Sequence, residues 1–165
     1  MRIQYGLCIR VLFLYKNEKM IQRDCAALLE QYSREFRAVM VVGPRQSGKT
    51  TLVRESFPDK PHVSLENPDE RLLAQGDPRA FLNRFPDGAV LDEVQRVPEL
   101  FNYLQEITDN SDRDGLFILA GSNNILLQER VSQSLAGRPG VLDLLPLSYR
   151  EVKDHSACDT TLNEL

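Results

Sequence analysis

The chain of 165 residues is long enough for one domain of ordinary size and too short for two. Hydrophobic residues make up 42% of it and charged residues 27%, which is typical of a globular domain. Lys and Arg number 20 and Asp and Glu number 24, so the net charge is −4. This charge argues against a domain held to nucleic acid or to a membrane by bulk positive charge.

The cysteines and histidines show no metal-binding or disulfide pattern. Cys8, Cys25 and Cys158 stand far apart without CxxC spacing, and His62 and His155 are equally isolated. An odd number of unpatterned cysteines predicts plain thiols in a reducing compartment. We therefore expect a cytoplasmic protein without a zinc site.

The first residues differ from the rest of the chain. The apolar stretch Tyr5–Tyr15 is interrupted by Arg10 and is followed by no small-residue cleavage site. It is also about half the length that a membrane-spanning helix needs. It could be an extra edge strand, a disordered leader, or sequence upstream of a true start at Met20. We expect residues 1–19 to be a leader or a mis-assigned start, with no membrane contact.

Apolar runs and helical patterns then alternate along the chain. Helical spacing or capping residues predict helices from Ile21 to Phe36, over Thr50–Phe57, after Asn67, after Asp77, after Pro98 and over Ile125–Ala136. Short apolar runs predict strands at Ala38–Val42, His62–Leu65, Ala89–Leu91, Leu116–Ala120 and Val141–Leu145. Strands that alternate with helices predict an α/β fold with a parallel sheet and right-handed crossovers.

The helix after Asn67 has the most detailed start signal. Asn67 can cap the helix, Pro68 fits its first turn, and Asp69 and Glu70 favour its positive end. Glu70 also lies three residues after the cap, the spacing of a capping box.

A phosphate-binding loop follows the first predicted strand. Residues 43–50 fit the pattern G-x-x-x-x-G-K-[ST] at every fixed position, between an apolar strand and a helix. The glycines allow close backbone approach, the loop amides and helix N-terminus face phosphate oxygens, and the lysine is a mobile cation. Within this loop, Arg45 could contact a phosphate or could simply face solvent. The predicted nucleotide-binding residues are Gly43, Pro44, Arg45, Gln46, Ser47, Gly48, Lys49, Thr50 and Thr51.

Two adjacent carboxylates follow the third predicted strand. P-loop NTPases place an aspartate at the end of a strand near the phosphate loop, where it helps to hold Mg²⁺. Asp92 fits this role, and the Thr50 hydroxyl is a second hard oxygen ligand. Glu93 is suited to orient and deprotonate an attacking water. Alternatively, the pair is a solvated strand end in which Glu93 caps the next segment.

Two further polar positions are candidates for catalysis. Ser122 and Asn123 end the fourth predicted strand and could contact the attacking water or the γ-phosphate, although both types also favour helix N-caps. Arg138 could act as an arginine finger on a neighbouring subunit, or it could simply complement a helix dipole. The catalytic candidates are thus Lys49, Glu93, Ser122, Asn123 and Arg138.

With these motifs, the chain resembles prokaryotic predicted ATPases of the AAA+ superfamily, in particular an uncharacterised group with a conserved C-terminal domain of unknown function. The resemblance runs from about Met20 to Glu151. It rests on Val42–Leu52, Leu91–Leu100, Gly121–Asn123, Ser134–Arg138 and Leu144–Ser148.

The resemblance implies a three-layer P-loop NTPase of the additional-strand class with a five-stranded parallel sheet in the order 5-1-4-3-2. It implies ATP and Mg²⁺ as cofactors, and hydrolysis as the reaction. It supports Ser122 and Asn123 as a sensor corner and strengthens Arg138 as a finger. It also implies an ATPase core over residues 20–152, with residues 153–165 beginning a truncated C-terminal region.

Three functions remain in competition at this point. A Mg²⁺-dependent ATPase could drive conformational change in a larger protein, as a homo-oligomer or through the missing C-terminal domain. A small-molecule kinase would need an acceptor site and a lid, which are not evident. A module that binds nucleotide without turnover is the third. GTP is disfavoured because no N-K-x-D motif is present, and this segment does not support nucleic acid as a partner.

Overall fold

The computed structural model describes residues 21–122 and 139–153. Residues Arg23–Ser148 form one compact unit, and the helical residues 149–153 belong to a second unit that is not placed relative to the first. The predicted helix Ile125–Ala136 lies outside the described residues. The elements follow in the order α2 (Ala26–Glu35), β1 (Ala38–Gly43), α3 (Lys49–Ser56), β2 (His62–Ser64), α4 (Pro68–Gly76), α5 (Pro78–Asn83), β3 (Ala89–Asp92), η2 (Val94–Arg96), α6 (Leu100–Asp109), β4 (Phe117–Ser122) and β5 (Pro139–Asp143).

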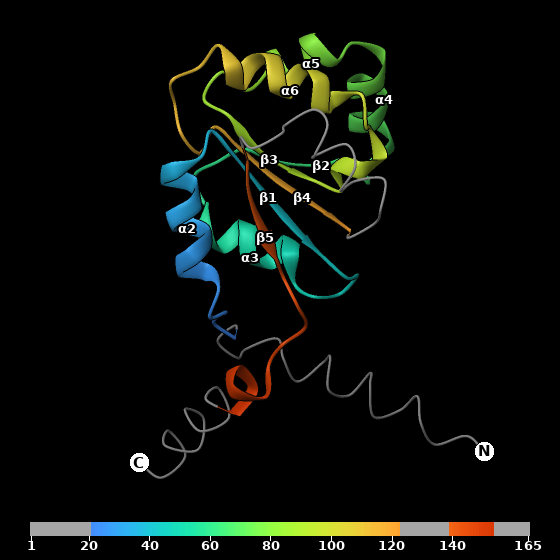
Figure 1. Ribbon diagram of the computed structural model, residues 1–165. Helices are drawn as coiled ribbons and strands as arrows, with labels where there is room; N and C mark the ends of the chain where they lie inside the picture. The colour runs from blue at the N-terminus through green and yellow to red at the C-terminus, as the bar shows by residue number, and fades with distance from the viewer. Residues whose placement is uncertain (1–20, 123–138, 154–165) are drawn as a thin grey trace, which may run out of the picture. The chain divides into compact units, whose positions relative to one another are not determined.

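The five strands form one parallel sheet in the order β2-β3-β4-β1-β5 (Figure 1). This is the predicted order 5-1-4-3-2 read from the other edge, so both the α/β class and the strand order are confirmed. β4 lies between β1 and β3, although it comes last of the three in the chain. The sheet therefore separates the two strands that lead into the sequence motifs by one intervening strand.

The fifth strand is displaced from its predicted position. We predicted Val141–Leu145, and the strand is Pro139–Asp143, paired with β1 from Ala38 onward. Gly140 lies under the edge-to-face ring pair of Tyr32 and Phe36, and a Cβ there would lie 2.7 Å from a Phe36 ring carbon. Gly140 of β5 is thus packed closely against two aromatic rings, a contact that local hydropathy does not reveal.

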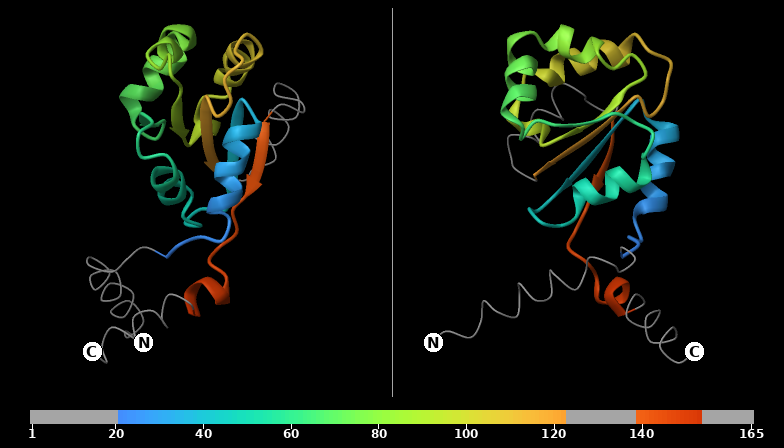
Figure 2. Two further views of the ribbon diagram at one scale, coloured as in Figure 1. Left: turned by 90° about the vertical axis from the view of Figure 1, so that its left-hand side faces the viewer. Right: turned by 180° about the vertical axis from the view of Figure 1, so that it is seen from behind.

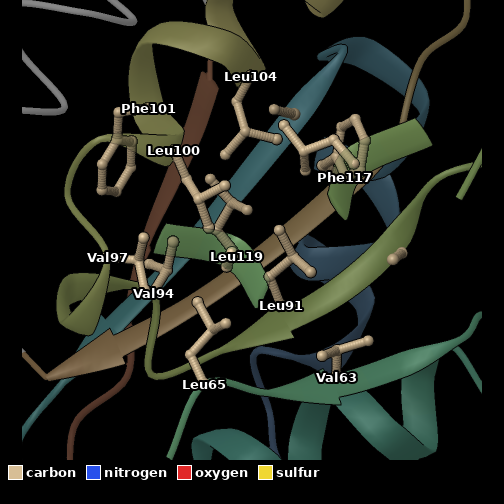
Figure 3. Packing of buried hydrophobic residues seen from close by; sticks show 14 of the residues in the cluster. Val63, Leu65, Leu91, Val94, Val97, Leu100, Phe101, Leu104, Phe117 and Leu119 are labelled. Atoms are coloured by element: carbon tan, nitrogen blue, oxygen red, sulfur yellow. The ribbon is translucent and has the colours of Figure 1, made fainter. Parts of the chain in front are cut away.

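Helices cover both faces of the sheet, as Figures 1 and 2 show. On one face, α2 and α3 bury Leu29, Leu52 and Val53 against the outer and central strands. On the other face, α4, α5 and α6 cover a second core. Figure 3 shows Leu100 and Leu104 of this second core lying over side chains of β3 and β4. The architecture is therefore the expected three-layer arrangement.

The central strands are buried on both faces. All residues of β1 and β3 are buried, which explains why these strands appear as unbroken apolar runs in the sequence. Within the described part of the chain, no helix is long and apolar enough to cross a membrane.

The helix starts at Asn67 and Asp77 are as predicted. Asn67 Oδ1 accepts from the amide of Asp69, and Asp77 Oδ1 accepts from that of Ala80, both at 2.9 Å. The predicted capping box at Glu70 is wrong. The Asn67 amide donates to Ser64 O, while the Glu70 carboxylate accepts two hydrogen bonds from Arg84, at 2.7 and 3.1 Å.

Candidate functional site

The carboxyl ends of three strands bring the candidate residues together. Gly43 at the end of β1 is in register with Ser122 at the end of β4, and Asp92 at the end of β3 is in register with Ala120. In a parallel sheet these ends lie at one edge, where ligands of open α/β folds bind. Residues that are far apart in the sequence thus face a common region.

The backbone of the phosphate loop has two left-handed residues. Gln46 has φ 64° and Gly48 has φ 90°, and Gly48 is the N-cap residue of α3. No side chain caps this helix, and its first turn contains no acidic residue. A helix N-terminus with uncapped amides favours an anion. Local backbone geometry therefore fits the predicted phosphate loop.

The Lys49 side chain folds back over the loop. Its Nζ donates to Gly43 O at 3.0 Å and to Pro44 O at 2.7 Å, and the residue is 5% exposed. Burial lowers the pKa of Lys49, against the opposing effect of the nearby carboxylates of Glu93 and Asp92. An ammonium group with partial desolvation and only carbonyl partners is well placed to attract a polyphosphate.

Two further features of the loop fit a phosphate group. Ser47 Oγ is buried and has no hydrogen-bond partner among the described residues. A side chain at Gly43 would collide with the carbonyl of Leu144, so the loop can pass there only as glycine. The loop at Gly43 therefore packs closely against the backbone of Leu144. The loop also contains the buried Ser47 hydroxyl, which has no partner among the described residues.

Thr50 and Asp92 supply the oxygen donors expected for a magnesium site. Thr50 Oγ1 donates to Asp92 Oδ2 at 2.6 Å, and the other carboxylate oxygen accepts from the Glu93 amide at 2.9 Å. Asp92 is 4% exposed. Mg²⁺ is usually held by one or two carboxylates together with phosphates and water, so a hydroxyl beside a carboxylate fits this ion.

Glu93 leaves the strand in a left-handed conformation, with φ 56° and ψ 39°. This turn interrupts the alternation of a strand, in which successive side chains point to opposite faces. Both adjacent carboxylates can therefore face the region at the ends of the strands. The conformation is uncommon for a residue with a Cβ and is often found at functional sites.

Gln95 belongs to the site and was missed by the sequence analysis. Its Nε2 donates to Glu93 Oε2 at 2.5 Å and lies 3.5 Å from Ser122 Oγ. The sequence signal available was a polar residue two positions after Glu93, in a short segment bounded by Val94 and Val97. The turn at Glu93 that brings Gln95 back over the carboxylate could not be read from the sequence.

Arg23 is a second residue that the sequence analysis missed. Its guanidinium donates to Ser47 O at 2.7 Å and to Leu145 O at 2.6 Å, which ties the phosphate loop to the chain after β5. Of the other predicted residues, Pro44, Arg45, Gln46 and Thr51 are exposed. Asn123 and Arg138, for which we predicted catalytic roles, lie outside the described residues.

Comparison with known proteins identifies the family. Residues 35–153 match the family described as AAA domain. Two uncharacterized proteins, from Mycobacterium bovis and Mycobacterium tuberculosis, are each 36% identical to the chain over 139 residues. The match covers 82% of this chain and 31% of each relative, so the chain spans about a third of the length of these relatives.

Solved structures of other proteins share the fold. The Walker-type ATPase PABY2304 of Pyrococcus abyssi superimposes with a TM-score of 0.59 at 15% identity, covering 88% of this chain and 59% of that one. Domain III of the replication initiation protein DnaA from Thermotoga maritima gives a TM-score of 0.54 at 17% identity, covering 88% and 72%. The chain therefore belongs to the AAA domain family and has the fold of a P-loop ATPase, which indicates nucleotide binding.

Proposed function

We propose that the chain is the core of a Mg²⁺-dependent ATPase whose hydrolysis drives conformational change in a larger protein. The observation that carries this proposal is the pair of carboxylates at the end of β3, one hydrogen-bonded to Thr50 and the next held by Gln95. A nucleotide-binding module needs the first carboxylate alone, whereas hydrolysis also needs a group that activates water.

In this proposal the phosphate loop binds the triphosphate. The amides at the start of α3 and the Lys49 ammonium bind the phosphate oxygens. Thr50 and Asp92 would hold Mg²⁺, which neutralises charge on the phosphates when bound. The lowered pKa of Lys49 in the free protein follows from burial, and a bound polyphosphate compensates that burial with opposite charge.

Glu93 is the proposed general base. Its carboxylate orients the attacking water and accepts its proton as the terminal phosphoryl group is transferred. Ser122, at the tip of the strand between the two motif strands, contacts the water or the γ-phosphate. We assign Asn123 to the same corner and Arg138 to a neighbouring subunit's phosphate.

Glu93→Gln provides the decisive test. We expect this variant to bind ATP with unchanged affinity and to release phosphate at least 100-fold more slowly than the unsubstituted chain. The exposed Glu99, six residues further on, offers Glu99→Gln as the matched control with full activity. Phosphate release by Glu93→Gln at the normal rate would exclude Glu93 as the general base.

The same assay separates the competing activities. The ATPase releases phosphate from ATP and Mg²⁺ without any added acceptor. Turnover that appears only with a small-molecule acceptor would identify a kinase, and tight ATP binding without turnover would identify a binding module.

A further inference from the structure

Gln95 joins two residues of the proposed site. Its amide nitrogen lies 2.5 Å from Glu93 Oε2 and 3.5 Å from Ser122 Oγ, so one side chain contacts both the end of β3 and the end of β4. The short contact is to the carboxylate and the longer one is to the hydroxyl. Gln95 is therefore placed to restrict the Glu93 side chain and to link it to β4.

The chemistry of the amide fixes its orientation. An ionised carboxylate is an acceptor only, so it must face the amide nitrogen, because the amide oxygen there would place two acceptors together. With the nitrogen turned to Glu93, Gln95 Oε1 is buried and has no partner among the described residues. A glutamine in a purely structural role would normally satisfy both ends of its amide.

The segment that carries Gln95 is anchored to the core and to neighbouring residues. Val94 and Val97, on either side of Gln95 in the chain, are fully buried in the core under α6. The Arg96 amide donates to Glu93 O at 3.0 Å, and the Arg96 guanidinium forms an ion pair with Glu66 at 3.1 Å. The short helix η2 can therefore hold the Gln95 side chain at a fixed position relative to the sheet.

We propose that Gln95 is a positioning residue that holds the Glu93 carboxylate in one orientation for water activation and ties this orientation to Ser122. The inference rests on the proposed hydrolysis. Glu93 needs such support because it has left the strand in a left-handed turn, so the sheet no longer determines where its side chain points. Displacing a catalytic group by about 1 Å can reduce a rate by about 100-fold.

The kinetic test compares two glutamines that each donate to a glutamate. Gln95→Met keeps the length of the side chain and removes the donor. The matched control is Gln31→Met, because Gln31 donates to Glu35 at 2.8 Å on the exposed surface of α2. We expect Gln95→Met to lower kcat by about 10-fold to 100-fold, with the affinity for ATP unchanged within about twofold. Gln31→Met leaves both values unchanged.

Two more variants sharpen the test. Gln95→Glu keeps the shape and places a carboxylate against Glu93, so we expect a loss of kcat at least as large as that of Gln95→Met. Ser122→Ala combined with Gln95→Met should lower kcat by less than the product of the two separate effects, because the residues are linked. A normal kcat in Gln95→Met, while Glu93→Gln is inactive, would overturn the positioning role and leave the proposed hydrolysis intact.

Nuclear magnetic resonance tests the contact without any turnover. In the unsubstituted chain, one side-chain amide proton of Gln95 should resonate downfield of ordinary glutamine signals because it is bonded to a carboxylate. In Glu93→Ala this signal should return to the ordinary position. An unchanged signal in Glu93→Ala would overturn the inference, even if the chain did not hydrolyse ATP.

Discussion

The hydroxyl of Thr50 donates a 2.6 Å hydrogen bond to the carboxylate of Asp92, which lies 42 residues further along the chain. The first residue lies in α3 and the second at the end of β3. The bond therefore connects the helix after the phosphate loop to a strand that is not adjacent to β1. This contact holds together the two groups proposed to bind Mg²⁺.

Removal of this hydroxyl should destabilise the nucleotide-free protein. Thr50→Val preserves shape and deprives the buried Asp92 carboxylate of its side-chain donor, so we expect the free energy of unfolding to fall by about 1–3 kcal/mol. Urea denaturation without nucleotide measures the change. Thr51→Val is the matched control, because Thr51 is exposed, and it should change stability by less than about 0.5 kcal/mol. Equal stability of the two variants would contradict the structural role of the bond.

ATP affinity should weaken at high pH through Lys49. Burial lowers the pKa of Lys49, so in the free protein its ammonium loses a proton at a lower pH than an ordinary lysine. The protonated form attracts phosphate, and affinity should therefore begin to decline at a pH below the ordinary lysine pKa of about 10.4. Calorimetric titration with ATP from neutral to alkaline pH measures the effect.

The Lys49 prediction has two controls. Lys49→Ala should bind ATP weakly at every pH and should show no decline. Lys60 also has a pKa lowered by burial, but it bonds to backbone carbonyls of Asp87 and Leu116 rather than to the loop. Lys60→Ala should therefore retain the decline, and its disappearance there would assign the titration to Lys60.

The ion pair between Glu70 and Arg84 should contribute pH-dependent stability. Hydrogen bonds from Arg84 lower the pKa of Glu70 in the folded protein. The stabilisation is therefore complete above the ordinary glutamate pKa of about 4.3 and is lost as the pH falls through the lowered value. The Arg84 side chain is 43% exposed, so Glu70→Gln should cost at most about 1 kcal/mol at pH 7. The stabilities of Glu70→Gln and the unsubstituted chain should converge as the pH falls through this lowered pKa; a constant difference would exclude the ion pair as its cause.

The core under α6 should be sensitive to truncation. Leu104 is fully buried against the second core, and Leu104→Ala should lower the free energy of unfolding by about 2–5 kcal/mol. Leu72 is 65% exposed, and Leu72→Ala provides a control with a change below about 0.5 kcal/mol. Similar losses in both variants would mean that Leu72 is covered in solution.

The predictable part of the fold was the part governed by local sequence. β1 and β3 are buried on both faces and therefore appear as continuous apolar runs, and Asn67 and Asp77 cap their helices through bonds to amides two or three residues away. The predicted fifth strand was two residues out, and Gly140 of the observed strand packs against the rings of Tyr32 and Phe36, a long-range contact that no local pattern shows.

The candidate site shows the same division. Lys49, Thr50 and Asp92 follow a spacing that the sequence displays, and the structure brings them together. Gln95 and Arg23 reach the site through a left-handed turn and a contact 24 residues away, neither of which has a sequence pattern. Residues that support a motif from outside it could be found only from the fold.

The position of β4 between β1 and β3 determines the width of the proposed site. Two strand spacings place β1 and β3 about 10 Å apart, with β4 between them. If β1 lay directly beside β3, the ends of these strands would be only one strand spacing apart, whatever side chains they carried. Side-chain substitutions can therefore change affinity and rate while the spacing stays the same. A one-residue slip of β4, by contrast, would turn Ser122 to the opposite face and place a different side chain at this position between β1 and β3.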